Sequence, residues 1–293
     1  MARVLVTGAS GFIGSAMTPA LAARGYEIRG GYRGAAPSAN DVAIGDLSGA
    51  TDWSTALRGV DVVVHLAGPA HARYGHAALQ TQIVEATSAL AAQAEAAAVR
   101  RFVYLSSIKA ACMRTRGSAV TEQGEAQDLD AYGAAKRAAE RAVLARQALN
   151  AVVLRPPLVF APDAKANFGS LLKLVASGAP LPLAGLSNRR SLISRASLID
   201  AVAASLDEAA PAGLFHIADR PALSSTEIVT ALAEGMGKPA RLFRAPSPLL
   251  PRALTESLAV DDSRFRAAYG EAWSRDARSA LIECARSFKQ RLP

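Results

Sequence analysis

A glycine-rich segment between a short strand and a helix, close to the start of the chain, restricts the fold more than any other feature. Arg3 to Thr7 is a β-branched run, and Phe12 to Arg24 has helical character. Gly8 permits a tight turn, Gly11 lets the backbone approach a phosphate, and Gly14 lets helix and strand pack closely. Because a helix N-terminus also favours anions, the segment predicts a pyrophosphate-binding loop for a dinucleotide. The residues expected to line this loop are Gly8, Ser10, Gly11, Phe12, Ile13 and Gly14.

Strand-like and helix-like segments alternate along the first half of the chain. Val60 to Leu66 is almost continuously apolar, as expected of a parallel strand covered by helices on both faces. The stretches from Ala77 to Ala98 and from Asp130 to Asn150 favour helices. Arg101 to Ser106 and Ala151 to Leu154 favour strands. This alternation predicts an α/β fold with a Rossmann-type, doubly wound parallel sheet.

The character of the sequence changes after Pro156, where Pro and Gly become frequent and periodic segments shorten. We therefore expect a second, smaller lobe that binds substrate. The Rossmann domain is expected to comprise residues 1–156 and 191–217, with the second segment returning to the main sheet. The smaller lobe is expected to comprise residues 157–190 and 218–293, including a closing C-terminal helix.

Composition excludes several classes of protein and partner. Of 293 residues, 51% are hydrophobic, which excludes a disordered chain, and only two are Cys, which excludes a disulfide scaffold. No apolar run approaches the roughly 20 residues of a membrane-spanning helix, so membrane insertion is not expected. The net charge of +8 comes mainly from Arg residues scattered along the chain, so nucleic acid is not an expected partner. We expect a reduced, cytoplasmic location and no metal site.

The end of the second strand, Glu27 to Gly31, discriminates between dinucleotides. An acidic side chain there bonds the ribose 2′-hydroxyl of NAD, whereas Arg suits the 2′-phosphate of NADP. No Asp or Glu occurs between the middle of this strand and Arg33. We therefore favour NADP over NAD, with Arg33 as the phosphate contact. Asp46 and Leu47 are candidates for contact with the adenine, although Asp46 is also a candidate helix cap.

Tyr132 and Lys136 are four residues apart on a predicted helix and therefore share one face. A free tyrosine, with a pKa near 10, is a poor base at neutral pH. A nearby ammonium and a positively charged nicotinamide both favour the phenolate, so we expect a lowered pKa for Tyr132. Ser107, at the end of a strand, is placed to bond the substrate oxygen. Together these residues predict proton transfer at a carbinol oxygen, paired with hydride transfer at its carbon.

At this point the chain resembles the extended short-chain dehydrogenase/reductase family, in particular its nucleotide-sugar epimerase and reductase branch. The matching motifs are TGASGFIG at Thr7–Gly14, HLAG at His65–Gly68, VYLSS at Val103–Ser107, YGAAK at Tyr132–Lys136 and LRPPLVFAP at Leu154–Pro162. The resemblance covers nearly the whole chain and implies that the Ser, Tyr and Lys described above form the catalytic trio. It also implies cofactor-side roles beside the nicotinamide and its ribose for Ala67, Gly68, Pro156 and Val159.

The same resemblance implies where the substrate binds. Arg190 falls where family members meet the phosphates of a nucleoside diphosphate, and Asn167 is a further candidate contact. A UDP-sugar is the favoured partner, and relatives often form homodimers through two central helices. Two departures from the family pattern matter. Ile108-Lys109 replaces the acidic pair of sugar dehydratases, which argues against a 4,6-dehydratase, and Ile83 replaces a common Asn on the cofactor side.

Four hypotheses of function follow. The first is NADPH-dependent reduction of a 4-keto UDP-N-acetylhexosamine, as in the synthesis of surface polysaccharides, and the absent strand-end acid favours it. The second is a UDP-sugar C4 epimerase with tightly bound NAD. The third is a non-catalytic dinucleotide sensor, which fold alone does not exclude but which the Tyr and Lys pair disfavours. Dehydrogenation of an aromatic or steroid alcohol also stays open, because the second lobe sets the substrate.

Overall fold

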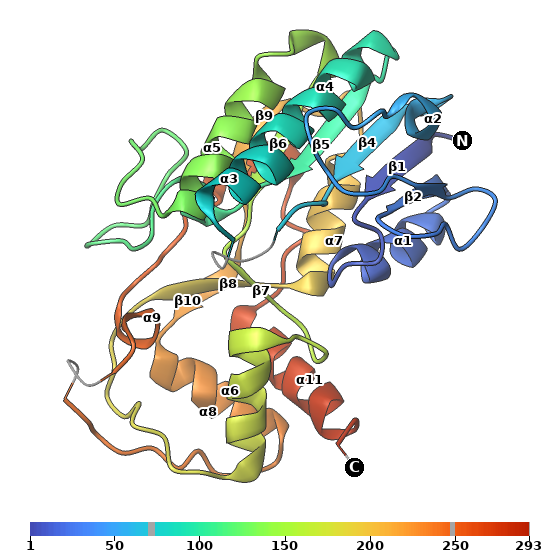
Figure 1. Ribbon diagram of the computed structural model, residues 1–293. Helices are drawn as coiled ribbons and strands as arrows, with labels where there is room; N and C mark the ends of the chain where they lie inside the picture. The colour runs from blue at the N-terminus through green and yellow to red at the C-terminus, as the bar shows by residue number, and fades with distance from the viewer. Residues whose placement is uncertain (70–73, 247–249, 293) are drawn as a thin grey trace.

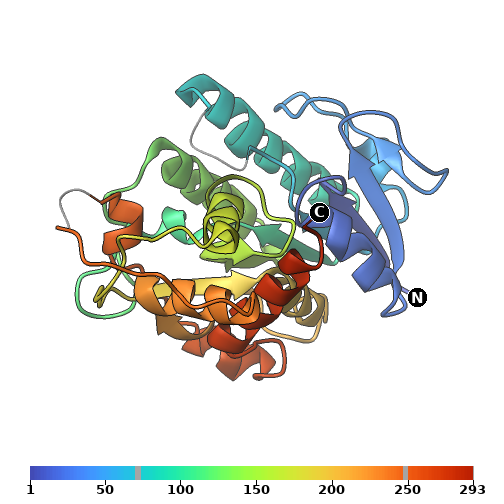
Figure 2. The same ribbon diagram turned by 90° about the horizontal axis from the view of Figure 1, so that it is seen from below.

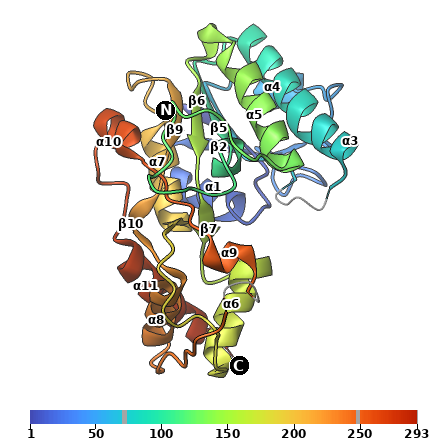
Figure 3. The ribbon, with the colours of Figure 1, turned by 90° about the vertical axis from the view of Figure 1, so that its left-hand side faces the viewer.

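The computed structural model describes residues 1–69, 74–246 and 250–292 and has two lobes (Figure 1). The larger lobe contains the N-terminus, and the smaller lobe below it contains the end of the chain (Figure 3). Seven parallel strands form the sheet of the larger lobe, which confirms the Rossmann-type α/β fold. In order across the sheet they are β3 (Val42–Ala43), β2 (Glu27–Tyr32), β1 (Arg3–Thr7), β4 (Val62–His65), β5 (Arg101–Leu105), β6 (Val152–Arg155) and β9 (Gly213–His216).

Alternate residues of the central strands enter two separate hydrophobic cores, one on each face of the sheet. Leu5 of β1 lies in one core, while its neighbours Val4 and Val6 lie in the other. The core of Leu5 is covered by α2 (Ser54–Leu57), α3 (His76–Leu79), η1 (Gln80–Glu85), α4 (Ala86–Ala96) and α5 (Ala131–Leu144). The core of Val4 and Val6 is covered by α1 (Gly14–Ala22), α7 (Arg195–Ala204) and α10 (Ser263–Tyr269). Both faces of the sheet are therefore buried, as the apolar strands predict.

The smaller lobe has its own three-stranded sheet and a third hydrophobic core. Its strands are β10 (Asp219–Leu223), β8 (Arg190–Ser194) and β7 (Leu158–Phe160). The helices assigned to this lobe are α6 (Ala166–Ser177), α8 (Ser225–Gly235), α9 (Arg252–Thr255) and α11 (Ala277–Lys289). Seen from below, this C-terminal part, coloured yellow to red, lies in front of the larger lobe (Figure 2). Between Ser107 and the end of β6 the chain also forms the short turns η2 (Ile108–Ala110) and η3 (Gln147–Leu149).

Two segments lie in other places than the sequence predicts. We expect residues 191–217 to return to the main sheet, but β8 pairs with β7 and β10, and only β9 joins the main sheet. Ile193 packs into the core of the larger lobe, and Leu192 packs into the core of the smaller lobe. Because both faces of β8 are buried, its apolar sequence does not indicate which of the two sheets it joins. Conversely, α10 returns to the larger lobe, because Phe265 packs on Phe215 of β9.

The two central helices are less regular than expected. The predicted helix from residue 77 to 98 contains the wide π-helical turn η1 between α3 and α4, and the helix predicted for residues 130–150 ends at Leu144. Asp130 is not in that helix but caps it, since Asp130 Oδ1 accepts a hydrogen bond from Gly133 N at 2.7 Å.

In the part of the chain that the structure describes, no helix has the length and apolar character needed to cross a bilayer.

Candidate active site

The glycine-rich loop packs so closely on the backbone around it that two of its positions leave no room for a side chain. Gly8 has φ +71°, and a Cβ atom there would lie 3.0 Å from the Ala67 backbone. A Cβ atom on Gly14 would lie only 2.2 Å from the Gly8 carbonyl oxygen. Helix α1 starts at Gly14 without a side-chain cap, and none of the described residues accepts a hydrogen bond from Phe12 N or Ile13 N. The loop therefore fits a dinucleotide pyrophosphate, because the free amides of Phe12 and Ile13 lie at the N-terminus of α1, which favours anions.

Thr7 and His65 hold the adjacent strand end in place. Thr7 Oγ1 accepts hydrogen bonds from Leu66 N and Ala67 N, each at 3.2 Å, so its own proton is donated to His65 Nδ1 at 2.7 Å. His65 Nε2 is then the protonated nitrogen and donates to Thr87 Oγ1 at 3.0 Å. Burial, and the charge of Lys136, lower the pKa of His65 to about 3. His65 is therefore a neutral residue that fixes the Thr7 hydroxyl, and Thr7 in turn binds the amide of Ala67.

Gly68 follows Ala67 directly, and it lies against the π-helical turn η1. A Cβ atom on Gly68 would lie 3.9 Å from Ile83 Cγ1 and from Gln82 O. Ile83, which stands where the resemblance implies Asn, therefore lies against the predicted cofactor residue Gly68. A π-turn inserted in an α-helix is often found at a functional site, and here it places Ile83 beside Gly68.

The proposed adenosine end of the site is open to solvent. Arg33 follows the end of β2, and its Nε lies 3.5 Å from Asp46 Oδ1. The side chains are 78% and 91% exposed, so neither is committed to the core. Leu47 packs partly against the core under α4. Asp46 is not a helix cap, since α2 starts only at Ser54.

The predicted catalytic residues come together where β5 and α5 meet. Ser107 is the N-cap of η2, and its Oγ accepts a hydrogen bond from Lys109 N at 3.3 Å. The first turn of α5 packs directly on η2, because a Cβ atom on Gly133 would lie 2.2 Å from Lys109 O. This contact brings the turn that holds Ser107 against the helix of Tyr132 and Lys136. Pro156 joins the same place, because its carbonyl oxygen accepts a hydrogen bond from Ile108 N at 2.9 Å.

The electrostatics of Tyr132 differ from the prediction. Burial, and the nearby carboxylate of Asp130, raise the pKa of Tyr132 to about 12 in the protein alone, whereas the sequence argument expects a lowered pKa beside Lys136 and a positively charged nicotinamide. Lys136 does not offset this effect in the protein alone, because its Nζ donates to Leu105 O at 3.0 Å and lies 4.7 Å from the Tyr104 ring centroid. Burial also lowers the pKa of Lys136 to about 8. In the protein alone, the Tyr132 phenol therefore keeps its proton at neutral pH.

A buried ion pair beneath these residues was not predicted from the sequence. Glu140 lies one helical turn after Lys136, and its two oxygens accept hydrogen bonds from Arg155 Nε at 2.8 Å and Nη2 at 2.6 Å. Ser106 Oγ also donates to Glu140, and the Glu140 and Arg155 side chains are each 3% exposed. Arg155 Nη1 further contacts His216 Nε2 at 3.4 Å. Glu140 therefore joins α5 to Ser106, which precedes Ser107, and to Arg155, which precedes Pro156. The Glu at i+4 from Lys136 was the available signal.

Two of the predicted substrate residues, Arg190 and Asn167, lie in the smaller lobe. Arg190 begins β8, and its Nη1 donates to the carbonyl oxygen of Glu256 at 3.0 Å. Asn167 is exposed in the first turn of α6. Val159 lies in β7, directly after the Pro156 segment, and packs partly on the core of the larger lobe. The structure thus brings the predicted trio together with Pro156, and puts Arg190 and Asn167 on β8 and α6 of the second lobe.

Comparison with known proteins gives a family match over most of the chain. Residues 4–218 match the model of the NAD dependent epimerase/dehydratase family. The chain is 33% identical over 264 residues to a UDP-glucose 4-epimerase of Vibrio cholerae, an alignment covering 84% of this chain and 79% of the relative. It is also 30% identical over 256 residues to a ceramide reductase of Caulobacter vibrioides (strain NA1000 / CB15N), covering 84% of this chain and 74% of the relative.

The fold also matches solved structures. A Bacillus cereus UDP-glucuronic acid 4-epimerase in complex with UDP-glucuronic acid and NAD superposes with a TM-score of 0.81 at 22% identity. The match covers 99% of this chain and all of the other chain, so both lobes have counterparts there.

Proposed function

Because the chain belongs to the NAD dependent epimerase/dehydratase family, we propose that it is a UDP-sugar C4 epimerase that works with NAD. The comparisons favour this hypothesis, which the sequence argument placed second, over the reductase that it placed first. The observation that carries the proposal is the packing of the Ser107 turn on the Tyr132 helix, in a chain 33% identical to a UDP-glucose 4-epimerase.

Each residue of the trio has a role in this reaction. Tyr132 exchanges a proton with the C4 oxygen of the sugar through its phenolic oxygen, and Ser107 Oγ bonds the same oxygen to hold it there. The ammonium of Lys136 stabilises the phenolate form of Tyr132. When bound, NAD⁺ supplies a hydride acceptor at C4 and a positive charge. The raised pKa of Tyr132 makes that charge necessary, so in this account proton removal waits for a loaded site.

The dinucleotide is held by the glycine loop and by Ala67 and Gly68. The unpaired amides of Phe12 and Ile13 suit its pyrophosphate. In the second lobe, the Arg190 guanidinium is proposed to meet the phosphates of the UDP moiety, and Asn167 to contact the nucleotide. Arg190 is already fixed by the carbonyl oxygen of Glu256, so it presents its remaining N–H groups without losing much side-chain freedom.

A second candidate function is NADPH-dependent reduction of a 4-keto UDP-sugar. One observation favours it, namely that Arg33 is exposed at the end of β2, where no acidic residue follows the strand. Replacing Arg33 by Ala tests this reading. An NADP enzyme loses affinity for NADP and keeps its affinity for NAD, whereas equal small effects on both dinucleotides support the NAD-dependent epimerase.

The proposal is tested by incubating the purified protein with NAD and either UDP-glucose or UDP-N-acetylglucosamine. An epimerase produces a mixture of the C4 epimers, followed by NMR, without net formation of NADH. Consumption of NADPH with a 4-keto UDP-sugar, and no interconversion of the two epimers, would replace the proposal by the reductase.

A further inference from the structure

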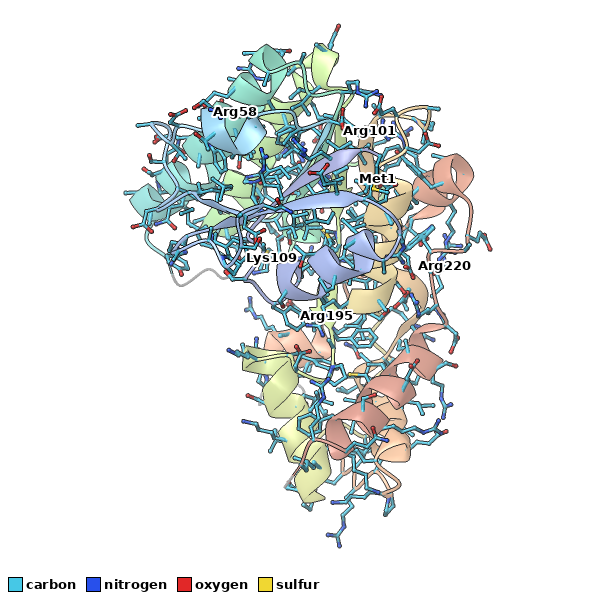
Figure 4. All side chains as sticks on the ribbon, turned by 90° about the vertical axis from the view of Figure 1, so that its right-hand side faces the viewer. Met1, Arg58, Arg101, Lys109, Arg195 and Arg220 are labelled. Atoms are coloured by element: carbon cyan, nitrogen blue, oxygen red, sulfur yellow. The ribbon has the colours of Figure 1, made fainter. Side chains whose placement is uncertain are left out.

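Arg195 connects the glycine loop to the smaller lobe. It is the first residue of α7 and lies at the junction of the two lobes (Figure 4). Its Nη1 donates to Phe12 O at 2.9 Å, and its Cζ lies 4.8 Å from the centroid of the Phe12 ring. The same guanidinium binds both carboxylate oxygens of Asp163, with Nη1 to Oδ2 at 2.9 Å and Nη2 to Oδ1 at 2.8 Å. One side chain therefore holds the glycine loop and the turn before α6, which belong to different proposed binding sites.

The local structure of α7 does not account for this arginine. A cation at the first position of a helix is disfavoured by the helix dipole, and Ser194 already caps this helix through the N–H of Ser197. The Arg195 side chain is only 16% exposed, so ordering it costs side-chain entropy. Its stabilising contacts are the bidentate pair with Asp163 and the bond to Phe12, which are charge-assisted and directional.

The bond to Phe12 acts on the peptide that faces the pyrophosphate. Phe12 O and Ile13 N–H belong to one peptide unit, and in a trans peptide they point in opposite directions. A guanidinium on Phe12 O therefore directs the Ile13 N–H away from Arg195, and it polarises that N–H as a donor. None of the described residues accepts a hydrogen bond from it. Arg195 thus prepares an anion-binding amide without touching the anion.

The bond to Asp163 continues rigidly into α6. Asp163 lies in the turn between β7 and α6. The next residue, Ala164, presses on the helix, because a Cβ atom on Gly169 would lie 2.2 Å from Ala164 O. A displacement of Asp163 is therefore transmitted to α6, the helix that begins beside Asn167.

We propose that Arg195 is a positioning residue that couples dinucleotide binding at the glycine loop to the order of α6 in the smaller lobe. The inference rests on the dinucleotide binding of the proposed function and adds a path by which the loaded cofactor site prepares the sugar-nucleotide site. Linkage requires the coupling to be reciprocal, so a nucleotide held by α6 also tightens the dinucleotide.

The test uses the whole protein and the variants Arg195→Met, Asp163→Asn and Arg275→Met. Arg275 is the matched control, because it also joins the smaller lobe to α7, through Asp200 at 2.9 Å, but does not touch the glycine loop. Dissociation constants for NADH and NADPH are measured by fluorescence. Arg195→Met should weaken the preferred dinucleotide on the order of ten-fold, since a charge-assisted bond is lost, and Arg275→Met should leave it unchanged.

Hydrogen exchange provides the readout that a merely structural role would not move. In the wild type and in Arg275→Met, saturation with the preferred dinucleotide should protect amides of residues 163–170. In Asp163→Asn this protection should be lost although the dinucleotide still binds, because Arg195 keeps Phe12 but loses its ionic hold on the second lobe. Protection that persists in Asp163→Asn, or that is absent from the wild type, would overturn the inference. Both readouts need only a dinucleotide, so failure of sugar turnover would refute the proposed function and leave this inference standing.

Discussion

The buried pair of Glu140 and Arg155 gives the sharpest prediction about stability. Gln in place of Glu140 keeps the volume and one acceptor oxygen but removes the charge, so the guanidinium of Arg155 stays buried without a carboxylate partner. Breaking a buried pair by neutralising one partner costs about 3–5 kcal/mol. At roughly 2 °C per kcal/mol for a chain of this size, the melting temperature should fall by about 6–10 °C.

The assay is urea unfolding followed by circular dichroism, with the free energy of unfolding extrapolated to water. The control is Glu234→Gln, which breaks an ion pair with Arg278 whose side chains are about half exposed. That change should cost no more than about 1 kcal/mol. If Glu140→Gln costs as little as the control, then Arg155 has found another partner or water, and the argument from burial fails.

Three further predictions concern the site itself. Tyr132→Phe should reduce turnover on the order of a hundred-fold or more while leaving the dinucleotide dissociation constant nearly unchanged, since only the proton-transferring oxygen is lost; equal losses in both would contradict the assignment. Gly14→Ala should weaken dinucleotide binding and lower the free energy of unfolding, because the new Cβ would lie 2.2 Å from a carbonyl oxygen. Gly34→Ala is the control, since a Cβ there meets nothing within 4 Å. It should change neither the dinucleotide titration nor the urea unfolding. Folding keeps His65 neutral down to a pKa of about 3, against 6.5 for a free histidine, so the unfolded state takes up the extra proton and stability falls as the pH drops through this window. The slope of unfolding free energy against pH between 6 and 4.5 should decrease by about 1.4 kcal/mol per pH unit in His65→Asn, and an unchanged slope would mean that the ring is charged in the fold.

Much of the fold can be predicted from the sequence because its signals are local. The glycine loop is bounded by a strand and a helix, and the buried strand from Val62 to His65 has three consecutive Val residues before its terminal His. The Tyr132 and Lys136 pair depends only on helical spacing. Each of these features is decided by residues close together in the chain, and each lies where it was expected.

The parts that the sequence did not reveal depend on distant contacts. The Arg155 partner of Glu140 lies 15 residues away, and the Phe12 contact of Arg195 lies 183 residues away. Nothing in the local pattern distinguishes these two arginines from those on the surface. The effect of Lys136 on Tyr132 was misjudged for the same reason, because the spacing of the two residues does not reveal that the ammonium is bound to Leu105 O.

The central claim, that the hydride leaves and returns at the same sugar carbon, is tested most directly with a UDP-sugar that carries deuterium at C4. The wild-type protein with NAD in ordinary water should give the C4 epimer with the deuterium still at C4, as followed by NMR and mass spectrometry. Loss of the label to free dinucleotide, or no epimer under conditions in which NADPH reduces a 4-keto sugar, would contradict the account.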